Sequence, residues 1–141
     1  MELWNKQRCI AIFVGTITEH TVEQSMEQNR RENMDLKKYT TNGKTFDQPE
    51  SFYSLSDQEQ ETLLAWCRQF KAITRINTRH TSYGLKHWFE HSPSGFSVSN
   101  GAFKGAMLLC GFICSDINDK NWQFNISEAS FKQITKEIKK G

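Results

Sequence analysis

Residues 56–70 read SDQEQETLLAWCRQF, and this stretch predicts the first helix of a compact domain. Ser56 and Glu59 have the spacing of a capping box, in which each side chain accepts a hydrogen bond from a free amide at the helix start. Apolar side chains then recur at helical spacing, at Leu63, Trp66, Cys67 and Phe70. We therefore expect a helix over residues 57–72.

The sequence beyond this helix predicts more short helices and a few short strands. Capping serine, threonine or asparagine residues stand before three further helical segments, at residues 82–91, 100–110 and 128–139. Gly111 fits the left-handed position that often ends a helix. Alternating apolar side chains predict strands at residues 96–99 and 121–126, and residues 73–77 form an extended link. The expected fold class is α+β, with three or four short helices and a small antiparallel sheet.

The N-terminal third has a weaker hydrophobic pattern than the rest of the chain. Residues 9–14 form a continuous apolar run, which is typical of a buried strand. Asn42 and Gly43 form a strong turn signal, so we expect a hairpin or loop over residues 39–55. We interpret residues 1–55 as an N-terminal strand and hairpin extension, and residues 56–141 as the α+β core domain.

Composition limits the classes of function. The formal net charge is only +2, so contact with nucleic acid would require a local basic patch. No apolar run approaches the roughly 18 residues that a membrane-spanning helix needs. Low cysteine density favours reduced thiols. We expect a cytoplasmic protein that has no membrane partner and no cofactor.

Residues 78–91, TRHTSYGLKHWFEH, hold three of the four histidines. On a helix, Tyr83 and His87 are four residues apart and lie on one side. His80 precedes the helix and can fold over its first turn. Histidine is the side chain best matched to proton transfer near neutral pH, so His80, Tyr83 and His87 are the candidate catalytic residues.

Two such histidines are able to cleave RNA without a metal ion. One would take the 2′-hydroxyl proton and the other would protonate the leaving oxygen. Arg79 or Lys86 would stabilise the charge that develops on the phosphorus centre. The same residues also fit RNA contact without chemistry, and a solvated helix face with no site at all.

Two further patterns bear on ligands. Asn100 and Lys104 lie in a glycine-rich helix start, NGAFKGAM at residues 100–107, where free amides and a lysine can receive a phosphate. Close packing of the two glycines is the alternative explanation. His87 and His91 are four apart, but the metalloprotease order His-Glu-x-x-His is missing, so we expect no metal site.

Three stretches carry a resemblance to a known family: INTRHTSYGLKHWFE at residues 76–90, GFSVSNGAFKGAML at 95–108 and NWQFNIS at 121–127. The segment 56–131 resembles a family of small proteins carried by plasmids, conjugative elements and phages of Gram-positive and gut bacteria. Ser97 stands where that family would have an aromatic residue. Some small proteins of such elements are type II anti-CRISPRs, which disable Cas9 or its guide RNA.

The resemblance implies a mobile-element counter-defence protein that acts on a Cas9–guide RNA complex, by occlusion or by damage to the guide. It implies a working surface that includes the partner-binding candidates Arg79, Lys86, Asn100 and Lys104. Two alternatives stay open. One is a metal-independent, histidine-based endoribonuclease, and the other is a non-enzymatic DNA- or RNA-binding regulator of the mobile element.

Overall fold

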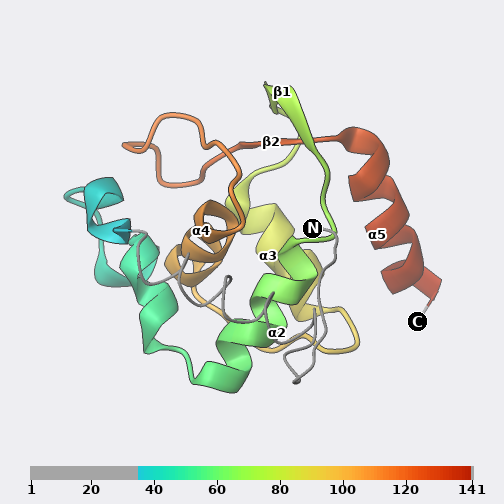
Figure 1. Cartoon of the computed structure of the whole chain (residues 1–141), viewed down its shortest axis with the longest axis horizontal. Helices are drawn as coiled ribbons and strands as arrows, with labels where there is room; N and C mark the ends of the chain where they lie inside the picture. The colour runs from blue at the N-terminus through green and yellow to red at the C-terminus, as the bar shows by residue number, and fades with distance from the viewer. Residues whose placement is uncertain (1–34, 141) are drawn as a thin grey trace, which may run out of the picture. The chain divides into compact units, whose positions relative to one another are not determined.

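The computed structural model describes residues 35–140, and Leu36–Gly141 form one compact unit (Figure 1). The predicted α+β class is confirmed. The described helices and strands are α2 (Asp57–Cys67), β1 (Ala72–Asn77), α3 (Ser82–Glu90), α4 (Asn100–Leu109), β2 (Phe124–Ile126) and α5 (Glu128–Lys140). The strand expected at residues 9–14 lies outside the described residues.

Helix α4 is the centre of the unit, because all ten of its residues are buried. It contacts α2, α3 and the segment that precedes α2. The Trp66 ring of α2 joins the helices, since it makes edge contacts with Phe89 of α3 at 5.5 Å and with Phe103 of α4 at 6.1 Å between centroids. Such aromatic pairs add about 0.5–1.5 kcal/mol each beyond the apolar area that they bury.

Residues 36–54 form three short 3-10 helices, whereas we expected a hairpin or loop over residues 39–55; no hairpin forms there. These are η1 (Leu36–Tyr39), η2 (Thr45–Asp47) and η3 (Pro49–Ser54). Leu36 and Phe52 are at most 1% exposed. Backbone from this segment packs directly on Gly101 and Gly105 of α4. A Cβ added at Gly101 would lie 2.2 Å from Gln48 O, and one added at Gly105 would lie 2.4 Å from Pro49 O, so neither position has room for a side chain. The boundary that we expected at residue 55 therefore falls inside the compact unit.

The sheet has two antiparallel strands and an irregular register. Ala72 pairs with Ile126 and Asn77 with Phe124, so β1 advances five residues while β2 advances two. The excess residues of β1 bulge outward, as extra residues in a ladder do. The Asn125 side chain bridges the irregular part, since its Nδ2 donates to Ile73 O at 2.9 Å. The link predicted at 73–77 is thus a paired strand, and the strand predicted at 121–126 is shorter.

Two other predicted bounds differ from the structure. Helix α2 has its capping box at Ser56 and Glu59 as predicted, but it ends at Cys67 and not at residue 72. No strand forms at residues 96–99, because the Val98 N–H donates to the Glu90 carboxylate at 2.9 Å instead of to a neighbouring strand. Gly111 has a φ of 94°, which is the left-handed helix end that the sequence predicted.

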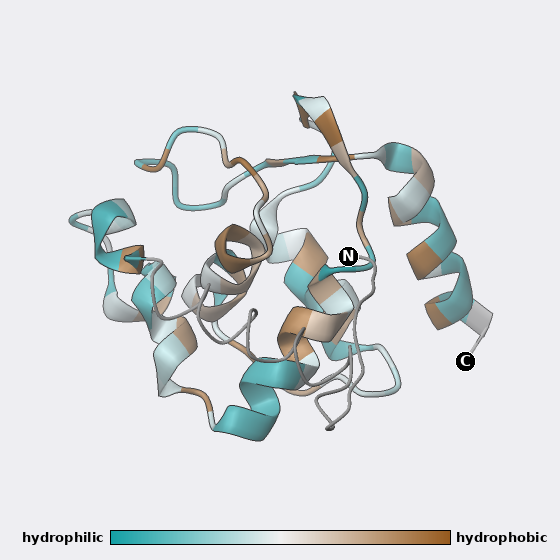
Figure 2. Ribbon diagram, in the orientation of Figure 1, coloured by the Kyte–Doolittle hydropathy of each residue, from teal (hydrophilic) through white to brown (hydrophobic). Residues whose placement is uncertain are grey.

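Helix α5 is amphipathic, and hydrophilic and hydrophobic bands alternate along it (Figure 2). Ser127 caps it by accepting from Ser130 N at 3.0 Å. The backbone of Lys71, directly before β1, anchors this end. Its carbonyl accepts from Ser127 N at 2.7 Å, and its N–H donates to the Ser130 hydroxyl at 3.1 Å. The start of α5 is therefore fixed to the sheet.

Candidate functional site

Helix α3 presents Tyr83 and His87 together, as their spacing predicted. The Thr81 hydroxyl caps the helix by accepting from Gly84 N at 3.3 Å. The ring of Tyr83 stands edge-on to that of His87, with 4.4 Å between centroids. Tyr83 is 50% exposed, and the His87 side chain is 45% exposed. This aromatic pair is open to solvent and able to meet a partner.

Glu90 organises the basic side chains of α3, a role that the sequence did not reveal. Its carboxylate accepts from Lys86 Nζ at 3.2 Å and lies 3.3 Å from His87 Nδ1. Burial favours a raised pKa for Glu90, but the Val98 N–H, Lys86 and His87 outweigh it and hold the pKa below its ordinary value. Lys86 is therefore engaged within the helix and is mostly covered.

His80 is held by α5 and not by α3. Its Nε2 lies 2.8 Å from Glu128 Oε1, and its ring stacks on Phe131 with 3.6 Å between centroids and 24° between planes. Asn77 Nδ2 donates to the same carboxylate oxygen at 3.1 Å. Burial favours a raised pKa for Glu128, but Asn77, His80 and the charge of Arg79 outweigh it, so the pKa is lowered. The His80 side chain is 19% exposed.

The two candidate catalytic histidines thus belong to separate networks. His80 is bound to Glu128 of α5, whereas His87 pairs with Glu90 on its own helix. Within residues 35–140, no hydrogen bond or ring contact joins His80 to His87. Arg79 is exposed beside the first network, and its backbone N–H donates to Asn77 Oδ1 at 3.0 Å.

Asn100 and Lys104 are buried on α4, with exposed fractions of 6% and 3%. Lys104 Nζ donates to Asp47 O at 3.1 Å and lies 4.6 Å from the centroid of the Trp122 ring. Burial lowers the pKa of Lys104, and the charge of Asp47 offsets this only in part. These polar groups fix η2 to α4, so their burial does not support the partner contact that we expected for them.

The same network joins the three stretches that carry the family resemblance. Ser82 N donates to Trp122 O at 2.6 Å, and the Ser82 hydroxyl accepts from Trp122 N at 3.0 Å and donates to Asn100 Oδ1 at 2.9 Å. Asn100 Nδ2 in turn lies 3.0 Å from Asn121 Oδ1. Buried polar groups need such partners, so these hydrogen bonds belong to the interior of the fold.

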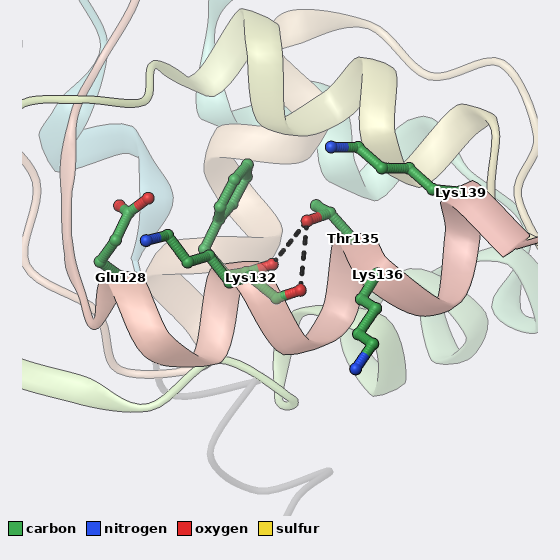
Figure 3. A pocket seen from close by; sticks show the side chains of 6 residues that line it. Glu128, Lys132, Thr135, Lys136 and Lys139 are labelled. Carbon is green, nitrogen blue, oxygen red and sulfur yellow. Dashed lines mark hydrogen bonds between the residues drawn. The ribbon is translucent and has the colours of Figure 1, made fainter.

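A hollow on α5 is lined by residues that the sequence patterns did not indicate as a site. It measures about 540 Å³ and is lined by Glu128, Phe131, Lys132, Thr135, Lys136 and Lys139. Figure 3 shows Lys132 and Lys139 extending back toward the Glu128 end of the helix, while Lys136 points away. Lys139 Nζ also lies 5.6 Å from the Trp88 ring of α3. The adjacent Phe131 and Lys132 are the signal in the sequence that could have indicated this hollow.

Other kinds of site receive no support from the part of the chain that the structure describes. Within residues 35–140, no three His, Cys, Asp or Glu side chains gather as a metal site. Cys67, Cys110 and Cys114 carry free thiols. None of the described helices is long and apolar enough to cross a membrane. No protein-family model, curated protein or solved structure matches the chain.

Proposed function

We propose that this protein is a non-catalytic counter-defence protein of the anti-CRISPR type, which binds a Cas9–guide RNA complex in the host cytoplasm and occludes it. The observation that carries the proposal is a set of solvent-accessible aromatic and cationic side chains on α3, on α5 and at Arg79, which precedes α3. His80, also before α3, stacks on Phe131 of α5. We name this set the α3–α5 face. Its members are Arg79, Tyr83, His87, Lys132, Lys136 and Lys139.

The composition of the α3–α5 face suits RNA held by a protein. Aromatic rings offer stacking surfaces for bases, and lysine or arginine side chains neutralise phosphates. Four of the six members carry a fixed positive charge, although the whole chain has a net charge of only +2. These four cations support the proposal of a local basic surface, which the overall charge alone would not supply. The link to Cas9 comes from the family resemblance and from no contact in the structure.

Cleavage of the guide has less support than occlusion. A metal-free ribonuclease needs an acid and a base within reach of one phosphate. His80 and His87 are each engaged with a different carboxylate, at 2.8 Å and 3.3 Å. Guide damage is accordingly an outcome of the test below and not part of the proposal.

The experiment adds the full chain to an assembled Cas9–guide RNA complex and measures cleavage of target DNA. The guide is then run on a denaturing gel, with and without EDTA. We expect inhibition with an intact guide. A shortened guide in EDTA would indicate the endoribonuclease instead. Binding to nucleic acid without any effect on Cas9 would favour a regulator of the mobile element.

A matched pair of variants connects the result to the α3–α5 face. Tyr83→Ala removes an aromatic ring that is 50% exposed, and Phe46→Ala removes one that is 53% exposed on η2. We expect weaker inhibition from Tyr83→Ala and unchanged inhibition from Phe46→Ala. Equal inhibition by both variants and the parent chain would contradict the assignment of this face.

A further inference from the structure

We propose that the hollow on α5 binds a short single-stranded RNA segment, with one base against Phe131 and the flanking phosphates along the lysines. This inference rests on the proposed function, because it names the ligand of one half of the α3–α5 face. The lining residues are those of α5, from Glu128 to Lys139 (Figure 3).

The size and lining of the hollow suit a base together with its phosphates. Its volume of about 540 Å³ lies within the range of small-ligand sites, about 300–1,000 Å³. Phe131 supplies a small apolar contact at the floor of the hollow, because its residue is 9% exposed and one face of its ring is stacked on His80. Three lysines supply cations that stay in water, since Lys132, Lys136 and Lys139 are all exposed.

Glu128 and the lysines of α5 would meet different parts of the ligand. Glu128 carries an ionised carboxylate, which only accepts hydrogen bonds. It therefore repels a phosphate and attracts the amino group of a base. Lys132 and Lys139 extend back toward the Glu128 end of the helix, so their ammonium groups would meet the phosphates that flank this base (Figure 3).

Single-stranded RNA fits this arrangement better than a duplex. A floor such as Phe131 is reached only by a base that is free of its neighbours and its pairing partner. In A-form duplexes the bases stay stacked, and the deep, narrow major groove excludes side chains. A hollow of this shape therefore selects loops, ends or unpaired guide segments.

The test measures the affinity of the full chain for a labelled ten-nucleotide RNA by fluorescence anisotropy, without Cas9, across several salt concentrations. The same RNA annealed to its complement, and inorganic polyphosphate as competitor, complete the set of probes. The double variant Lys132→Ala/Lys139→Ala alters the hollow. The double variant Lys44→Ala/Lys120→Ala removes equal charge from exposed positions on other segments.

We expect the α5 double variant to lose about tenfold or more in affinity for the single strand. Its salt slope should fall by about 1.4, because each phosphate contact on a single strand contributes about 0.7. The control double variant should stay within about twofold of the parent. The duplex should bind more weakly than the single strand, and polyphosphate should compete poorly.

Three results would overturn the inference: equal losses in both double variants, equal affinity for duplex and single strand, or full competition by polyphosphate. Each would indicate attraction to charge alone. Failure of the inference and failure of the proposed function are separable. If the chain does not inhibit Cas9 but RNA binding still depends on Lys132 and Lys139, only the proposed function fails. If inhibition stands while the α5 variant keeps its RNA affinity, only this inference fails.

Discussion

Replacing Gly101 by alanine should destabilise the protein strongly, because backbone from η2 and η3 occupies the space beside it. An added Cβ would lie 2.2 Å from Gln48 O, 2.7 Å from Gln48 N and 2.8 Å from Asp47 C. All three atoms are backbone, so none can turn away as a flexible side chain would. Overpacking typically costs about 1–3 kcal/mol, and this contact belongs at the upper end.

The expected sign is informative, because alanine favours a helix over glycine by about 1 kcal/mol where space is open. Gly84 on α3 provides the matched control, since its Cβ would have only Thr81 Oγ1 nearby, at 3.8 Å. Urea unfolding followed by circular dichroism should show a loss of about 2–3 kcal/mol for Gly101→Ala. Gly84→Ala should be neutral or up to about 1 kcal/mol more stable.

In thermal unfolding, Gly101→Ala should lower Tm by about 10–20 °C, at roughly 4–8 °C per kcal/mol for a domain near this size. A Gly101→Ala protein as stable as the parent would refute the packing of residues 36–54 on α4. Destabilisation of similar size in Gly84→Ala would show that the effect is not specific to that packing.

Three further predictions follow from the same contacts. His80→Ala should cost about 1–2 kcal/mol of unfolding free energy in urea, because it removes the Phe131 stack and a partly covered hydrogen bond to Glu128. His87→Ala should cost under about 0.5 kcal/mol, because its contact with Glu90 is more exposed. Equal costs would contradict the separate networks. Lys104→Met should keep full inhibition and RNA binding, since this buried side chain does not reach a ligand; lost RNA affinity in a folded variant would restore it as a binding residue. Glu128 has a lowered pKa in the folded state, so its contribution to stability is full above the ordinary glutamate pKa and is lost as the pH falls through the lowered value. Urea unfolding from pH 7 to pH 3 should therefore show a steeper acid loss for the parent than for Glu128→Gln, and identical pH profiles would count against this ion pair.

Local chemistry in the sequence predicted the helices of the core well. Ser56 and Glu59 form the capping box, and Thr81 and Ser99 cap α3 and α4 through bonds to residues three positions on. Gly111 takes the left-handed conformation at the end of α4. These features depend on neighbours in the chain, so a sequence pattern is enough to find them.

Features that depend on distant residues were not predictable in this way. Asn42 and Gly43 suggested a hairpin, yet burial of Leu36 and Phe52 against α4 decides the conformation of that segment. Lys104 had the character of a ligand-binding side chain in the sequence. Its hydrogen-bond partner, Asp47, lies 57 positions away, so no local pattern indicates that the two residues pair in the interior. In each case the outcome depends on a long-range contact that leaves no periodic pattern in the sequence.

The same limit applied to the candidate site. The spacing of Tyr83 and His87 predicted their contact, which is local to one helix. The partner of His80, in contrast, is Glu128 at a separation of 48 positions, which the spacing of the histidines does not reveal. The hollow on α5 depends on where Phe131 meets α3, and the sequence alone does not contain that information.

The central claim is that the protein meets its target through the α3–α5 face. Hydrogen–deuterium exchange of the full chain, free and bound to an assembled Cas9–guide RNA complex, tests this most directly. We predict slower exchange on binding in peptides that cover residues 78–91 and α5, with no change across residues 111–121. Protection confined to residues 111–121 or to η1–η3, with α3 and α5 unchanged, would contradict the account.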